Sequence, residues 1–208
     1  MEDTRYFHNI IIMPPRDLIY ARLGYRRGKT KVDDRQKEEI ERAIEQAQSF
    51  MELKGAAKRI RIEKITSSEV VLAQGITFDS RQLSSMLKDS NEALLMAATA
   101  GNRIMQAIKV ESDSGNLTRA VILDAVASET TDKVLDWISS FYKQELVRQG
   151  LNLTSRRYSA GYGDLDLKHQ KTIYDTLGLN RLGVKITDSY ILIPEKSVTA
   201  IAGIKQAA

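Results

Sequence analysis

The sequence contains no cysteine, and His8 and His169 are its only histidines among 208 residues. The lack of cysteine excludes disulfides, thiolate nucleophiles, iron–sulfur clusters and cysteine-ligated zinc. Two imidazoles are too few for a histidine-rich metal site, so no metal ligands are predicted. A chain without thiols also suits a reducing compartment, and we expect a cytoplasmic location.

Long apolar runs are absent as well. No run approaches the roughly 20 residues that a membrane-spanning helix needs. The opening "MEDTRYFHNIIIMPP" joins an acidic start to a short apolar run, which is unlike a signal peptide. The composition, with 42% hydrophobic and 28% charged residues, is that of an ordinary globular protein. We therefore expect one sizeable domain with no membrane partner.

Aromatic residues are few, at 6%, although the formal net charge is +4. Nucleic-acid-binding proteins usually gather basic residues on one face, with stacking aromatics between them. The one dense basic stretch is "YARLGYRRGKTK", residues 20–31, and an isolated stretch of this kind is typical of a solvated surface. We expect no nucleic-acid partner.

Apolar spacing and turn residues predict a mixture of helices and strands. Helices are predicted over 16–23, from Asp33 or Asp34 to Gly55, and over 81–87, 101–110, 117–149 (as one helix or two in tandem) and 168–178. Strands are predicted over 58–65, 69–73 and 75–78, 92–100 and 151–158, with two or three more within 183–204.

The order of these elements indicates the fold class. Strands and helices follow one another without a regular βαβ alternation, which favours an α+β fold over a doubly wound parallel sheet. We predict a single domain over residues 1–208, with a mainly antiparallel mixed sheet flanked by helices. Residues 1–32 are predicted to form an N-terminal helical extension that packs on it.

The stretch "RRYSAGYGDLD", residues 156–166, is the strongest candidate for a site. Gly161 and Gly163 flank Tyr162 and permit a positive φ, so the backbone amides can turn toward a carboxylate, ribose or phosphate. Arg157 is placed to clamp a carboxylate. Asp164 and Asp166 are candidates for a ligand ammonium or for capping the next helix. Together these groups suit a zwitterionic or nucleoside-like ligand, and the alternative is an exposed turn with an aspartate cap.

Other candidate positions carry weaker signals. The turn "AATAGN" (97–102) has a single glycine, Gly101, which disfavours a Rossmann-type methyltransferase. Glu129 lies within the predicted long helix and is either solvated or a contact to a ligand amine or ribose. His169 is predicted to be a capping or surface residue. No Ser–His–Asp set, carboxylate dyad or phosphate-binding loop is recognisable, so no catalytic residue is predicted.

The C-terminal half resembles the activation domain of vitamin B12-dependent methionine synthase. That family has an R-x-x-x-G-Y motif, a helix, a K-[IL]-T-[ED]-S segment, a proline and a final strand. Here the same order reads "RYSAGY" (157–162), "KHQKTIYDTLG" (168–178), "KITDS" (185–189) and "IPEKSVTAIAGI" (193–204). The chain departs from the family at Tyr158 and Ala160, which replace prolines beside the motif.

The resemblance implies a ligand and its contacts. The family domain binds S-adenosylmethionine, so Arg157 would hold the methionine carboxylate. The adenosine portion would be held by the bend, at Ser159, Ala160, Gly161 and Tyr162. Glu129 would add a polar contact, because it falls where the family has a ligand-contacting glutamate.

The resemblance also implies partners. The family domain docks over a cobalamin-binding domain, and a flavodoxin-like or other low-potential protein supplies an electron to cob(II)alamin before S-adenosylmethionine remethylates it. This sequence has no D-x-H-x-x-G cobalamin motif and no zinc-thiolate site, so we expect a stand-alone reactivation module that meets its corrinoid partner in trans. The alternative is a scaffold or interaction protein of the same fold that has lost the nucleoside.

Overall fold

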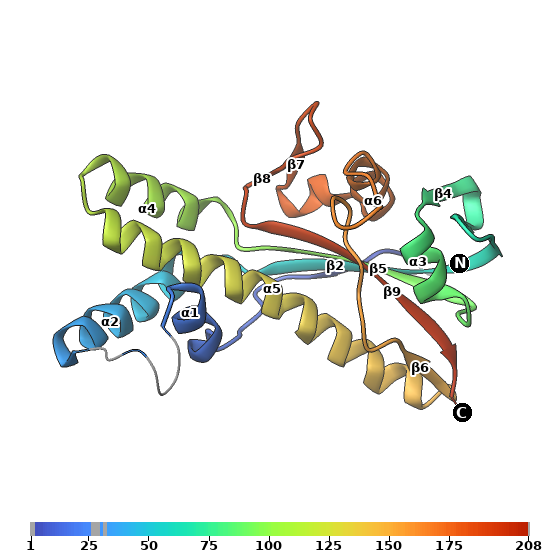
Figure 1. Cartoon of the computed structure of the whole chain (residues 1–208), viewed down its shortest axis with the longest axis horizontal. Helices are drawn as coiled ribbons and strands as arrows, with labels where there is room; N and C mark the ends of the chain where they lie inside the picture. Colours follow the sequence, from blue (N-terminus) through green and yellow to red (C-terminus); the bar gives the residue numbers. More distant parts are fainter. Residues whose placement is uncertain (1–2, 26–29, 31–32, 208) are drawn as a thin grey trace.

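The structure is a computed structural model that describes residues 3–25, 30 and 33–207, and a single twisted sheet forms its centre (Figure 1). In this part of the chain, the strand order is β4-β3-β2-β5-β9-β6, and β1 also pairs with β2. Every pairing in the sheet is antiparallel. The strands are β1 (Arg5–Phe7), β2 (Lys54–Ile65), β3 (Glu69–Leu72), β4 (Ile76–Asp79), β5 (Glu92–Thr99), β6 (Leu151–Leu153) and β9 (Ser197–Gln206).

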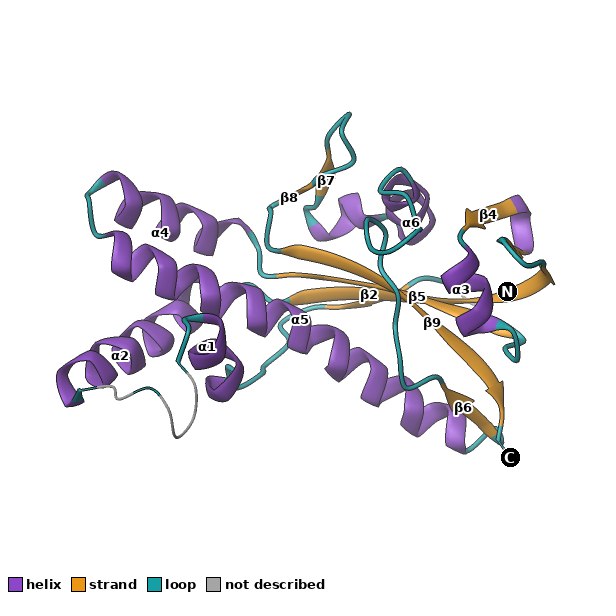
Figure 2. Cartoon of the chain, in the orientation of Figure 1, coloured by secondary structure: helices purple, strands orange, loops and turns teal. Residues whose placement is uncertain are grey.

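Helices cover both faces of this sheet, which confirms the α+β prediction (Figure 2). On one face lie α1 (Arg16–Arg22), α2 (Asp34–Phe50), α4 (Asn102–Asp113) and α5 (Leu117–Val147). On the other lie α3 (Arg81–Leu87), α6 (His169–Leu177), the 3-10 turn η2 (Leu179–Leu182) and the small hairpin of β7 (Lys185–Ile186) and β8 (Leu192–Ile193). A further 3-10 turn, η1 (Ala73–Gly75), joins β3 to β4.

The almost wholly apolar sequence of strand β5 is explained by its position in the centre of the fold. Leu94 and Met96 pack into the core under α5, whereas Leu95 and Ala97 pack into the core under α6. Successive side chains of a strand point to opposite faces, and both faces are covered here. The prediction of a buried strand in this segment is confirmed.

Helix α5 crosses one face of the sheet as one continuous helix of 31 residues. No proline or glycine interrupts its sequence. Its inward side is mostly apolar, with Ile122 and Leu123 near the start and Leu146 near the end. This settles the open alternative in favour of one helix rather than two.

Helix α2 ends earlier than the sequence predicted. The apolar stripe and the next glycine had placed its end at Gly55. Asp33 caps it by accepting a hydrogen bond from the backbone N–H of Gln36 at 2.8 Å, and the helix stops at Phe50. Gly55 lies inside β2, and a Cβ there would come within 2.7 Å of Cδ1 of Ile138 in α5. This glycine therefore allows the long helix to approach the sheet closely, rather than ending a helix.

The N-terminal segment contributes to the sheet as well as to the helical layer. Residues of β1 pair with Gly55, Ala56 and Ala57 of β2, and α1 contacts α5. Part of the basic stretch 20–31, at residues 26–29 and 31, lies outside the described residues. None of the helices that the structure describes is long and apolar enough to span a bilayer.

Strand β6 is shorter than predicted, and this shapes the edge of the sheet. It pairs with β9 only from Leu151 to Leu153, after which the chain leaves the sheet and returns for one bridge between Tyr158 and Ile201. Beyond that bridge, no described strand pairs with the first part of β9 on this edge. The glycine-containing bend begins here.

Candidate functional site

The bend at residues 159–165 is a tight turn held by its own backbone. Gly161 has φ of +85° and Gly163 has φ of +53°, a region that favours glycine. The amide of Gly161 donates to the carbonyl of Leu165 at 2.8 Å, and that of Tyr162 donates to the carbonyl of Ser159 at 3.3 Å. These two amides are therefore used inside the turn. The N–H groups of Ser159 and Ala160 have no hydrogen-bond acceptor among the described residues.

Asp164 fixes this bend to a distant helix. Its carboxylate accepts hydrogen bonds from the Ser80 hydroxyl at 2.5 Å and from the backbone N–H groups of Arg81 and Gln82 at 2.8 and 3.3 Å. The hydrogen bond from Ser80, helped by those from the backbone, lowers the pKa of Asp164. Asp164 thus caps α3, and it neither caps the helix that follows nor is free for a ligand ammonium. Asp166 does cap the following segment, since it accepts from the N–H of Lys168 at 2.8 Å.

Arg157 points to helix α5 and not into bulk solvent. Its Nη1 lies 2.5 Å from Oδ1 of Asp136, and its Nη2 lies 2.7 Å from Oδ2 of Asp132. Lys133 lies 3.0 Å from the other carboxylate oxygen of Asp136. Burial alone would raise the pKa of Asp136, but hydrogen bonds from Arg157 and Lys133 outweigh it and lower that pKa. The same two aspartates raise the pKa of Arg157 against the opposing effect of burial.

A hollow of about 500 Å³ lies beside the bend, at the open edge of β9, and we call it the β9-edge cavity. It is bounded by α5, the bend, α6 and the start of β9. The residues that line it are Asp132, Leu135, Arg157, Tyr158, Ser159, Ala160, Tyr162, Gln170, Ser197, Val198 and Thr199. Arg157, Ser159, Ala160 and Tyr162 were predicted as site residues, and the structure brings them together here. Gly161 shapes the bend behind this wall.

The open edge of β9 adds backbone groups to the cavity. Ile201 exchanges both of its backbone hydrogen bonds with Tyr158, at 2.7 and 2.8 Å, on this edge. Consecutive residues of an antiparallel strand direct their N–H and C=O groups to opposite edges, so residues two apart share an edge. Thr199, two residues before Ile201, therefore directs its backbone N–H and C=O toward the cavity. This gives the cavity a donor and an acceptor that no motif revealed.

Among the polar cavity residues that the sequence reasoning missed are Asp132, Gln170, Ser197 and Thr199. The side chain of Gln170 accepts from the Thr199 hydroxyl at 2.7 Å, which joins α6 to β9 across the cavity wall. These residues come from three separate elements, and each looks like a solvated polar residue in its own segment. The spacing of Asp132 and Asp136, one helical turn apart, was the one available signal for a basic partner.

The structure places Glu129 away from the other predicted site residues. Its Oε1 accepts from Nη1 of Arg22 in α1 at 3.0 Å, and it does not line the β9-edge cavity. It lies on α5 less than a turn from Asp132, but it is held by the N-terminal helix. Its carboxylate therefore fixes α1 to α5 in this structure.

His169 is an interior residue, so the prediction of a surface position was wrong. Its ring is buried against Phe78, and its Nε2 accepts a hydrogen bond from the backbone N–H of Asp79 at 3.3 Å. Burial lowers the pKa of His169, although the charge of Asp79 opposes the shift. This histidine joins α6 to β4 and lies outside the cavity wall.

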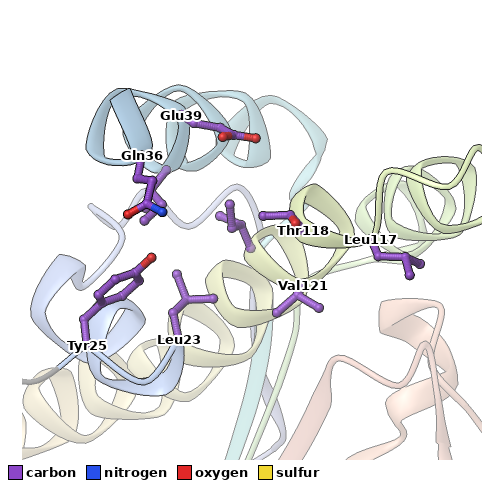
Figure 3. Close-up of a pocket in the computed structure, with 9 residues that line it drawn as sticks. Leu23, Tyr25, Gln36, Glu39, Leu117, Thr118 and Val121 are labelled. Carbon is purple, nitrogen blue, oxygen red and sulfur yellow. The ribbon is translucent and has the colours of Figure 1, made fainter. Parts of the chain in front are cut away.

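A second hollow, of about 570 Å³, lies between the end of α1, α2 and the start of α5 (Figure 3). Figure 3 shows Leu23 and Tyr25 at the end of α1 on one side of it, and Gln36 and Glu39 of α2 on the other. Its lining contains no basic side chain. None of the predicted site residues lines it, and the described residues contain no cluster suited to a metal ion.

Comparison with known proteins identifies the fold. No protein-family model matches the sequence, and no curated protein matches it. A crystal structure of the MetH reactivation domain bound to AdoHcy matches with a TM-score of 0.68, covering 96% of this chain and 78% of that chain at 11% identity. At this identity the match shows a shared fold. The resemblance drawn from the C-terminal motifs is therefore confirmed at the level of the fold.

Proposed function

We propose that this protein binds S-adenosylmethionine in the β9-edge cavity and serves the reductive reactivation of a corrinoid methyltransferase. One observation supports this above the others. Arg157 and the Gly161 bend border the same hollow, in a fold shared with a solved structure that is bound to AdoHcy. The hollow of about 500 Å³ also has the size of a small-molecule site.

The proposed contacts follow from the groups that face the cavity. Arg157 binds the carboxylate of the methionine portion. The free amides of Ser159 and Ala160, together with the ring of Tyr162, hold the adenosine portion, while Gly161 supports the turn. Tyr162 is 71% exposed, so its ring is free to cover a bound base. We leave Glu129 out of the proposed site, because Arg22 occupies its carboxylate.

The proposed chemistry needs no acid or base from this chain. A bound S-adenosylmethionine supplies a methyl group that the positive sulfur already activates. A flavodoxin-like or other low-potential protein gives one electron to cob(II)alamin on the partner, and the resulting cob(I)alamin takes the methyl group, leaving S-adenosylhomocysteine. The contribution of this chain is to position the methyl group, which is the main source of rate in such a transfer.

The proposed partner is the cobalamin-binding domain of methionine synthase or another corrinoid protein, which this chain meets in trans. The proposal gives no role to nucleic acid or to a membrane, and it places the protein in the cytoplasm with its partner.

Two measurements test this function in order. Calorimetric titration with S-adenosylmethionine and with S-adenosylhomocysteine should show binding of both. The protein is then added to a cob(II)alamin-loaded corrinoid protein with a flavodoxin-type donor, and the absorbance of methylcobalamin is followed. Methylcobalamin that forms at the same rate without this chain would refute the reactivation role.

A second candidate function is supported by the partners of Arg157. Because both of its Nη atoms already bind aspartates, the fold is also compatible with a scaffold or interaction protein that no longer binds the nucleoside. The same titration separates the two candidates. No heat and no shift in melting temperature at millimolar S-adenosylmethionine would favour the scaffold.

A further inference from the structure

The two aspartates that hold Arg157 are not equivalent. Asp136 lies between two cations, since one of its oxygens meets Arg157 and the other meets Lys133. Asp132 accepts from Arg157 through Oδ2 at 2.7 Å and through its backbone carbonyl at 3.5 Å, and no described residue hydrogen-bonds its Oδ1. The side chain of Asp132 is also 57% exposed. One carboxylate is therefore satisfied by the protein, and the other keeps an unused oxygen.

The carboxylate with the unbonded oxygen belongs to the lining of the β9-edge cavity. Asp132 lines this cavity together with Arg157, whereas Asp136 and Lys133 do not. The charges on the cavity wall are thus one guanidinium and one carboxylate, side by side. Arg157 itself retains donor capacity, because its Nε–H has no described acceptor. A wall of this kind presents both a cation-binding and an anion-binding group to the same ligand.

We infer that Asp132 binds the ammonium group of the ligand's amino-acid end, next to the carboxylate that Arg157 binds. The inference rests on the proposed function. The ammonium and the carboxylate of an amino acid are attached to the same carbon, so a ligand held by Arg157 through its carboxylate must place its ammonium within reach of a neighbouring group. Asp132 is the neighbouring anion that faces the cavity.

This assignment makes Asp132 a specificity-determining residue. A carboxylate beside Arg157 repels ligands that bring only an anion, such as a free phosphate or a simple carboxylic acid. It favours a ligand whose anionic end carries a positive group as well. The cavity would then select zwitterionic amino-acid ends and reject anionic ones, although it contains an arginine.

The test compares Asp132→Asn with Asp136→Asn in the full-length chain. Both changes remove one negative charge from the same face of α5 and both remove one partner of Arg157, but only Asp132 lines the cavity. Three probes are titrated: S-adenosylmethionine, its decarboxylated form, which keeps the amine, and 5′-methylthioadenosine, which has neither group. Circular dichroism melting confirms that each variant is folded.

The inference predicts that Asp132→Asn weakens both amine-bearing probes by about tenfold or more, the effect of a hydrogen bond to a charged group. It predicts no change for 5′-methylthioadenosine and a smaller loss for Asp136→Asn. Equal or tighter binding of S-adenosylmethionine by Asp132→Asn would overturn it, since Asp132 would then merely compete for Arg157. Failure of the unmodified protein to bind any probe would instead refute the proposed function, and the inference with it.

Discussion

Replacing Gly161 by alanine tests whether the bend is a strained turn that exists to shape the cavity. Gly161 has φ of +85°, and an added Cβ would lie 3.1 Å from Cδ1 of Leu167. An L-residue in this region costs about 1–2 kcal/mol, and alanine recovers about 0.4–1 kcal/mol by restricting the unfolded chain. The contact with Leu167 is tight but meets the end of a flexible side chain, so it adds little.

The net expectation is a loss of about 1 kcal/mol in the free energy of unfolding, which lowers the melting temperature of a chain of this size by about 2–4 °C. Gly150→Ala is the matched control, because Gly150 also has a positive φ, of +67°, but has no atom within 4 Å of an added Cβ. Thermal unfolding followed by calorimetry should show similar losses for both variants.

Only the Gly161 variant should also lose affinity for S-adenosylmethionine, because only that turn borders the cavity. Titration calorimetry on both variants checks this difference. If Gly161→Ala unfolds at or above the temperature of the unmodified chain and binds equally well, the bend is neither strained nor part of the site, and the reasoning fails.

Three further predictions address the clamp, the core and the response to pH. Arg157→Ala should weaken S-adenosylmethionine binding by about 1.5–3 kcal/mol, while the exposed neighbour change Arg156→Ala should leave titration calorimetry unchanged; equal binding by both variants would remove Arg157 from the site. Gly55→Ala should destabilise the fold by about 1–3 kcal/mol through the clash with Ile138, and chemical denaturation should show partial rescue in Gly55→Ala/Ile138→Val if that clash is the cause. Burial lowers the pKa of His169 in the folded state, so the unfolded chain binds more protons. The stabilising contribution of His169 is therefore present above about pH 6.5 and is lost as the pH falls through the folded-state pKa. Denaturation midpoints measured from pH 7.5 down to 5 should fall for the unmodified chain and fall less for His169→Gln. Midpoints that fall equally with pH in both proteins would contradict this.

Local patterns in the sequence were sufficient for most secondary structure. The stripe of Ile40, Ala43 and Ile44 predicted α2, and Asp33 supplied its cap as expected. Helix α3 begins after Ser80, and α6 ends at Gly178 in the left-handed conformation, both as predicted. Each of these features depends on residues within one or two turns of the chain, which is why the sequence alone reveals them.

Local patterns failed where a residue's role depends on a distant partner. Gly55 looked like a helix terminator, but it admits the side chain of Ile138 between α5 and the sheet. Asp164 looked like a cap for the next helix, but it caps α3, which precedes it by more than 70 residues. His169 looked like a surface residue because the segments that bury it lie elsewhere in the chain.

The bend itself was determined by the sequence, because only glycine adopts such φ values cheaply and two glycines flank Tyr162. Its chemistry was decided by the tertiary structure. The fold brings Arg157 to Asp132 and Asp136, leaves the edge of β9 open beside them, and turns Glu129 to Arg22. A short sequence specifies its own backbone conformation, but the charge and shape of a cavity depend on which distant segments the fold places around it.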